Sequence, residues 1–233
     1  KAMEAELKEA EFQRDRLIEE MRRLAVRDAL TGLYSRRAFN DELNQAWQIG
    51  ERRGLPLSLL MLDIDHFKVL NDTFGHQVGD QILIETSHLI RATVRAGDIV
   101  SRYGGDEIAV ILPLTGPEET HRVGERLLYA FRKNIFCRGI HDLHVMVSIG
   151  AASGAGRAQP ASHILTRADQ ALYRAKQLGR NVLCLSEPES TSPFVAVGNI
   201  TSGAAAGHET TAPAGKGRIL VVDDDQAICR MVC

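Results

Sequence analysis

Residues 57–62 form a nearly continuous apolar run, Leu-Ser-Leu-Leu-Met-Leu, which restricts the possible folds more than any other segment. An apolar stretch of this length is typical of a strand that is buried on both faces. Such a strand needs other elements packed on both sides, so we expect a sheet whose two faces are covered by helices.

The run ends in Asp63-Ile64-Asp65. Side chains alternate along a strand, so Asp63 and Asp65 should point to the same side. Carboxylates at the end of a buried strand are unfavourable unless something neutralises them. Mg²⁺ (or Mn²⁺), held by a few carboxylates and by substrate phosphates, would do so. In the alternative interpretation, Asp63 caps the next helix and Asp65 is solvated.

A second acidic segment, residues 102–108, reads Arg-Tyr-Gly-Gly-Asp-Glu-Ile and is flanked by residues that favour strands. Gly104 and Gly105 can adopt the positive φ values of a hairpin turn and would let a ligand approach the backbone. Asp106 and Glu107 then lie at the rim of a sheet, where they can hold a divalent cation. Together, the two acidic segments favour a metal site over simple capping.

The predicted elements alternate along the chain between helices and strands. Together they indicate an α/β (α+β) domain of the ferredoxin-like or nucleotide-cyclase kind, with a central mixed β-sheet flanked by helices. The expected helices span 35–54, 66–73, 80–94, 117–136 and 160–178, and the expected strands span 57–62, 102–112 (a hairpin), 143–152 and 182–185.

Residues 27–186 are predicted to form this domain, with different segments at each end. Residues 1–26 are a charged helix with a heptad stripe that Arg14 interrupts, which favours a parallel coiled coil over a lone amphipathic helix. The stripe consists of Met3, Leu7, Ala10, Leu17, Met21 and Leu24. Residues 187–216 have the Ser, Thr, Gly, Ala and Pro content of a flexible linker, and residues 217–233 begin a new strand that ends in acids.

Composition excludes several classes of function. The net charge is −2, which gives no electrostatic case for nucleic acid or membrane as a partner. No apolar run approaches the roughly 20 residues that span a bilayer. The four cysteines lack zinc-binding spacing, so we expect reduced thiols in a cytoplasmic protein.

Basic and amide side chains accompany the acids. Lys68 follows the first acidic segment, and Lys176 and Arg180 lie at the end of the last predicted helix. These three cations could grip a triphosphate, or the last two could complement the helix dipole. Asn71 and Asp80 could hydrogen-bond the edge of a guanine, or could cap the Gly-rich turn between them.

Five segments, in this order and spacing, resemble the GGDEF family of diguanylate cyclases. The resemblance covers residues 27–186, with Ile108 at the position of the family's Phe. The matching segments are Asp28-Ala-Leu-Thr-Gly-Leu-Tyr-Ser-Arg-Arg37, Asp63-Ile-Asp-His-Phe-Lys-Val-Leu-Asn-Asp-Thr-Phe-Gly-His76, Gly79-Asp80, Arg102-Tyr-Gly-Gly-Asp-Glu107 and Ala171-Leu-Tyr-Arg-Ala-Lys-Gln-Leu-Gly-Arg-Asn181.

The resemblance implies condensation of two GTP molecules into cyclic di-GMP, with release of two pyrophosphates, across a homodimer of facing domains. It implies metal ligation by Asp63, the Ile64 carbonyl, Asp106 and Glu107, and Glu107 could instead help to deprotonate the 3′-hydroxyl. Asp106, Glu107 and Lys68 would take part in catalysis. The substrate would be bound by Asn71, Asp80, Lys68, Lys176, Arg180, Gly104 and Gly105.

Residues 95–98 read Arg-Ala-Gly-Asp and match the family's RxxD product-binding site, which Arg126 would complete. The resemblance therefore implies inhibition by cyclic di-GMP. The alternative is a surface Arg95–Asp98 pair with little energetic weight.

Two other functions are compatible with the same segments. A catalytically silent domain could bind GTP or cyclic di-GMP as a signalling receptor, and another nucleotide cyclase could share the fold. Residues 218–233 resemble the start of a response-regulator receiver domain, with Asp223 and Asp224 as its acidic ligands.

Overall fold

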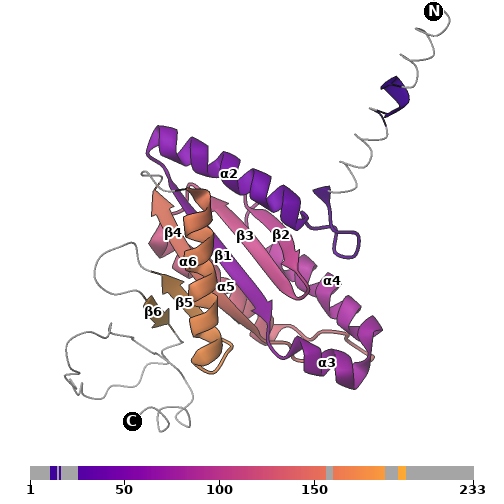
Figure 1. The fold of residues 1–233 in the computed structure, drawn as a ribbon. Helices are drawn as coiled ribbons and strands as arrows, with labels where there is room; N and C mark the ends of the chain where they lie inside the picture. The colour runs from indigo at the N-terminus through magenta and orange to yellow at the C-terminus, as the bar shows by residue number, and fades with distance from the viewer. Residues whose placement is uncertain (1–10, 15, 17–25, 156–159, 187–193, 198–233) are drawn as a thin grey trace, which may run out of the picture.

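The computed structural model describes residues 11–14, 16, 26–155, 160–186 and 194–197 (Figure 1). Residues 11–14 and 16 are helical. The named elements that follow are α2 (Arg36–Arg53), β1 (Pro56–Ile64), α3 (Phe67–Phe74), α4 (His76–Thr93), β2 (Ile99–Gly104), β3 (Glu107–Pro113), α5 (Pro117–Lys133), β4 (Val147–Ala155), α6 (Ala161–Gln177), β5 (Leu183–Ser186) and β6 (Phe194–Val197).

The strands form one mixed sheet in the order β2-β3-β1-β4-β5-β6. β1 lies at its centre and is antiparallel to both β3 and β4, whereas β4 and β5 are parallel. In Figure 1, α2 and α6 lie across one face of the sheet and α4 and α5 lie behind it. The predicted mixed sheet flanked by helices is therefore confirmed.

β1 is buried on both faces, as its apolar run predicts. Leu59 and Met61 join a core that includes residues of α2 and α6, whereas Leu60 and Leu62 join a second core that includes residues of α4 and α5. All four side chains are almost fully buried. This packing on both faces fixes the direction of β1 and so the position of the acids at its end.

Two glycines determine how the helices meet the sheet. Gly54 adopts φ 64° and ends α2, which begins at the predicted cap Ser35, whose side chain accepts a hydrogen bond from the Ala38 N–H. Gly150 on β4 faces α6, where an added Cβ would lie 2.1 Å from the Leu172 nitrogen. Only glycine therefore allows α6 to lie this close to β4, and α6 carries Lys176.

Several predicted boundaries were wrong. α5 ends at Lys133 instead of residue 136, because Phe136 leaves the helix, enters the core and forms a bridge with Leu143. β4 begins at Val147 instead of residue 143, since Leu143 makes only that isolated bridge. α4 begins at His76, one turn before the predicted start.

The predicted linker contains a strand. β6, with the sequence Phe-Val-Ala-Val, pairs antiparallel with β5 at the edge of the sheet. A short run of residues that favour strands beside an unpaired strand edge is sufficient for such pairing. Residues 187–216 are on average rich in small and polar residues, so the short apolar run at 194–197 was not recognised as a strand.

Most of the predicted coiled coil, the rest of the linker and residues 217–233 lie outside the described residues. Within the described part, Cys137 and Cys184 are buried and form no disulfide, and burial raises the pKa of Cys184 to about 11. No helix of the described residues has the length and apolar content needed to cross a bilayer.

Candidate functional site

The two acidic segments meet at one end of the sheet. Asp63, near the end of β1, is the direct cross-strand partner of Glu107, the first residue of β3. The Asp63 side chain is 11% exposed. Burial raises its pKa, and the negative charges of Asp106 and Glu107 raise it further. The predicted convergence of Asp63 with the hairpin acids is therefore present.

The hairpin places its acids through its two glycines. The β2–β3 pairing shifts register between Arg102 and Gly104, and Gly105 has φ 22°. A Cβ on Gly104 would lie 3.3 Å from Glu107 Oε2, so that carboxylate lies close to the bare Gly104 backbone. The Glu107 carboxylate therefore occupies the space beside Gly104, and the predicted approach of a ligand to this backbone stays a prediction.

The hairpin is also tied to the loop before α2, a contact that the sequence analysis missed. Arg102 Nε donates to the Gly105 carbonyl at 2.9 Å, and its Nη1 lies 3.2 Å from Asp28 Oδ1. Burial alone would raise the pKa of Asp28, but hydrogen bonds from Thr31 and the nearby Arg102 hold it below its ordinary value. No local pattern connects residues 74 positions apart.

Lys176 lies inside the acidic cluster. Its Nζ is 2.7 Å from Asp63 Oδ2, and this ion pair opposes the rise in the pKa of Asp63. The sequence predicted Lys176 as a phosphate ligand and did not predict this pair. Lys176 is half-buried on α6, so the close packing of α6 against Gly150 determines where the Lys176 ammonium group lies.

Asp65 is buried, so the alternative in which it is solvated is wrong. Its carboxylate accepts hydrogen bonds from Ser148 Oγ at 2.7 Å and from the Asn181 backbone N–H at 3.0 Å. Burial raises its pKa, which these hydrogen bonds oppose. Asp63 does not cap α3, since the residue at that cap is His66.

The predicted guanine-binding residues lie on neighbouring helices. Asn71 on α3 is half-buried, and its Oδ1 is a buried atom with no hydrogen-bond partner in the structure. This oxygen lies against Gly79 on α4, where an added Cβ would be only 1.8 Å away. Asp80 follows Gly79 and is exposed, as is Lys68 on α3. The oxygen is therefore both buried and unsatisfied, which is unusual for a polar atom in a folded protein.

The donor chemistry fits a hard divalent cation. Asp63, Asp106, Glu107 and the Ile64 carbonyl offer only oxygen atoms. Burial, and to a lesser extent repulsion from the other two acids, raises the pKa of Asp63, and a bound cation would offset both. In the described ranges, however, no three His, Cys, Asp or Glu side chains are already gathered for a metal. The cluster is therefore a set of nearby donors, not a finished metal centre.

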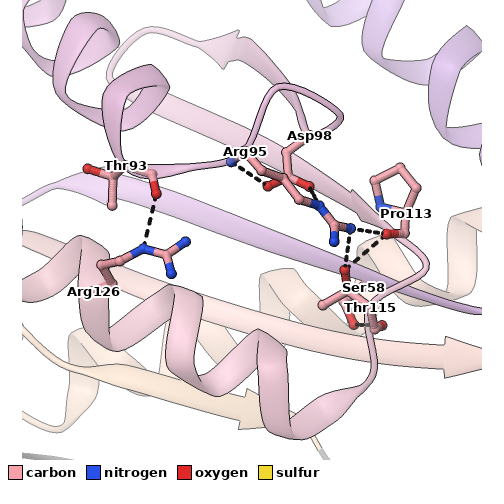
Figure 2. Close-up of polar contacts among 7 residues, drawn as sticks. All are labelled: Ser58, Thr93, Arg95, Asp98, Pro113, Thr115 and Arg126. Carbon is pink, nitrogen blue, oxygen red and sulfur yellow. Dashed lines mark hydrogen bonds and ion pairs between the residues drawn. The ribbon is translucent and has the colours of Figure 1, made fainter.

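The predicted inhibitory residues are brought together at the end of β2 and β3 that lies opposite the hairpin (Figure 2). Arg95 Nε donates to Asp98 Oδ1 at 2.9 Å, and its Nη2 donates to Thr115 Oγ1 at 2.9 Å and to the Pro113 carbonyl. The Arg95 side chain is 54% exposed but that of Asp98 only 1%, so the pair is more than a surface contact.

Arg126 on α5 reaches the same segment. Its Nε donates to the Thr93 carbonyl at 3.0 Å, just before Arg95 (Figure 2). A cavity of about 480 Å³ lies beside Arg95 and Asp98, and Arg27, Tyr34 and Arg91 also line it. The region is therefore rich in arginine and suited to an anionic ligand.

Comparison with known proteins identifies the family of this chain. Residues 25–182 match the family model described as "Diguanylate cyclase, GGDEF domain". The response regulator PleD of Caulobacter vibrioides is 40% identical over 162 residues, which are 69% of this chain and 36% of PleD. The diguanylate cyclase DgcP of Pseudomonas aeruginosa is 39% identical over 166 residues, which are 71% of this chain and 25% of DgcP.

A solved structure is similar in fold as well. The coiled coil and GGDEF domain of DgcB from Caulobacter crescentus, in complex with c-di-GMP, matches with a TM-score of 0.66 and 33% identity. The match covers 80% of this chain and all of that one (100%). The chain spans about a third or less of the two curated relatives above.

Proposed function

Because the chain belongs to the GGDEF family of diguanylate cyclase domains, we propose that it condenses two GTP molecules into cyclic di-GMP and releases two pyrophosphates. The observation that carries this proposal is the meeting of Asp63, Asp106, Glu107 and Lys176 at one end of the sheet. Phosphoryl-type transfer needs this combination of acids for a metal and cations for phosphates.

Mg²⁺ or Mn²⁺ would be held by Asp63, Asp106, Glu107 and the Ile64 carbonyl. When bound, the ion would neutralise phosphate charge and polarise the reacting phosphorus. Lys176 would leave its ion pair with Asp63 and bind a phosphate oxygen of the nucleotide instead. Arg180 and Lys68 would bind other phosphate oxygens. Glu107, whose carboxylate lies beside Gly104, would join the metal ligands or accept the proton of the 3′-hydroxyl.

Guanine would be read by Asn71 and Asp80. The unpaired Asn71 oxygen supports this role: it is buried against Gly79, and if the side chain turned toward the base, an N–H of guanine would satisfy it. An exposed carboxylate such as that of Asp80 can accept from the N1 and N2 hydrogens of guanine together, and adenine has neither of these hydrogens.

Each domain holds one nucleotide, so the reaction needs two chains. We propose a homodimer that is brought together by the predicted coiled coil of residues 1–26, which would raise the effective concentration of one half-site near the other. In this arrangement the 3′-hydroxyl of each GTP attacks the α-phosphate of the other.

Incubation of the protein with GTP or ATP and Mg²⁺, followed by mass analysis of the products, tests the reaction. Cyclic di-GMP from GTP alone is the expected result. A cyclic adenine product would favour another nucleotide cyclase, and nucleotide binding without any product would favour a silent receptor domain.

We further propose that cyclic di-GMP inhibits the enzyme at Arg95, Asp98 and Arg126. The support is their proximity and the cavity of about 480 Å³ beside two of them. Arg95→Ala should remove most product inhibition and leave the initial rate unchanged, because Arg95 does not contact the acidic cluster. Equal inhibition of the variant and the wild type by added product would contradict this role.

A further inference from the structure

The turn after α6 has an unusual backbone. Gly179, Arg180 and Asn181 adopt φ values of 106°, 68° and 51°, all in the left-handed region. Glycine tolerates this region and asparagine adopts it more readily than most residues, but Arg180 is strained there. Such strain persists only where surrounding contacts hold the backbone in place.

Contacts from two other elements hold this turn. On one side, the buried carboxylate of Asp65 accepts the Asn181 backbone N–H at 3.0 Å. On the other side, Arg132 at the end of α5 donates from Nη2 to the Asn181 carbonyl at 2.9 Å and from Nε to Asn181 Oδ1 at 3.3 Å. The N–H, the carbonyl and the side chain of Asn181 are thus each held by a hydrogen bond from or to another segment.

The helix itself supplies one more bond. The Arg180 N–H donates to the Ala175 carbonyl at 3.1 Å, which closes the end of α6. The Arg180 side chain is exposed, whereas the Asn181 backbone beside it is fixed. The direction of Arg180 therefore depends on how firmly Asn181 is held.

We infer that Arg132 and Asp65 are positioning residues for Arg180: they clamp Asn181 and so aim the Arg180 guanidinium at the phosphates of bound GTP. This inference rests on the proposed GTP site. It assigns a role to Arg132 that no feature of the sequence indicated, since Arg132 lies 48 positions before Arg180.

Arg132 is the better residue to test, because Asp65 is two positions from Asp63 and its substitution could disturb the acidic cluster. Arg132→Met keeps the half-buried aliphatic stem and removes both donors to Asn181. Arg122→Met is a matched control on the same helix, since Arg122 is exposed and pairs with the exposed Glu119.

The probe is 3′-deoxy-GTP with Mg²⁺, which lacks the attacking hydroxyl and therefore binds without reacting. Arg132→Met should weaken its binding about tenfold, the effect of losing one hydrogen bond to a charged group. Arg122→Met should bind like the wild type. With GTP as substrate, Arg132→Met should raise KM more than it lowers kcat.

A double-mutant cycle separates positioning from a general loss of structure. If Arg132 acts through Arg180, then Arg132→Met has no further effect in an Arg180→Ala background. Losses that multiply instead, to about a hundredfold, would overturn the inference, as would normal binding by Arg132→Met. If Arg132→Met fails to fold, Asn181→Gly allows the same cycle, because it keeps the left-handed backbone and loses one Arg132 acceptor.

The wild-type protein separates this inference from the proposed function. Wild type that binds 3′-deoxy-GTP but makes no cyclic di-GMP would contradict the proposed reaction, and the cycle would still decide the role of Arg132. Wild type that binds no guanosine triphosphate would contradict both.

Discussion

At Asp63, stability and activity make opposite demands. Its carboxylate is buried beside two other acids, and burial and their charges raise its pKa above the ordinary value of 3.8. The ionised form of Asp63 is needed to hold a cation, but it is unfavourable in the folded protein when no cation is bound. A functional residue that destabilises the fold is a common compromise at active sites.

This conflict predicts a dependence on pH. Because the pKa is raised on folding, the folded chain keeps a proton on Asp63 where the unfolded chain has lost it, and stability falls as the pH rises from 3.8 through the raised value. Asp63→Asn should therefore unfold at a higher temperature than the wild type at neutral pH without divalent cations. The difference should vanish below pH 3.8. A variant that is less stable at neutral pH would refute this.

Gly79 shows how a residue without a side chain shapes the site. A Cβ added at Gly79 would lie 1.8 Å from Asn71 Oδ1 and would displace that amide. Gly79→Ala should raise KM for GTP about tenfold or more, the effect of losing one or two hydrogen bonds. The fold should survive, since alanine favours a helix more than glycine does.

Gly116→Ala is the control for Gly79→Ala, because a Cβ at Gly116 meets no atom within 4 Å. Steady-state kinetics with GTP and thermal unfolding of both variants decide the question. If Gly79→Ala has an unchanged KM, then Asn71 does not read the base.

Among the elements, β1 and the β2–β3 hairpin were predicted well from local sequence. A run of apolar residues and a Gly-Gly turn are signals carried by adjacent positions. The ends of α5 and β4 were predicted poorly, because the contact of Phe136 with Leu143 decides them. β6 was missed because it depends on the open edge of β5.

The position of α6 depends on Gly150, which could have been noticed as a glycine inside a predicted strand. Its Cβ would meet backbone atoms at 2.1 Å (Leu172 nitrogen) and 2.3 Å (Ala168 carbonyl), which cannot rotate away. Gly150→Ala should therefore cost about 1–3 kcal/mol of unfolding free energy or more. Urea unfolding measures it, and a wild-type midpoint would mean that α6 can shift freely.

In the candidate site, the sequence predicted the residue types but not their partners. Asp63, Asp106 and Glu107 meet as expected, yet the Lys176–Asp63 pair and the Asn71–Gly79 contact join separate segments that no spacing rule connects. The Arg102–Asp28 and Arg132–Asn181 contacts were missed for the same reason. Long-range contacts of this kind become visible only once the sheet order is known.

For the whole molecule, the proposed reaction requires two chains, and the heptad stripe of residues 1–26 is the element proposed to join them. Changing Leu17 and Met21 to glutamate should lower the specific activity at low protein concentration, because charges disrupt an apolar seam. High protein concentration should restore activity. Specific activity that does not change on dilution would show that this helix is not required for pairing.

The central claim is that acids from β1 and from the hairpin serve one metal-dependent transfer reaction. The most direct test measures cyclic di-GMP formed from GTP with increasing Mg²⁺ by the wild type, by Asp106→Ala and by a control, Asp41→Ala, whose exposed carboxylate lies on α2. We expect product that depends on Mg²⁺ from the wild type and the control, and none from Asp106→Ala. Equal product formation by Asp106→Ala would contradict the account.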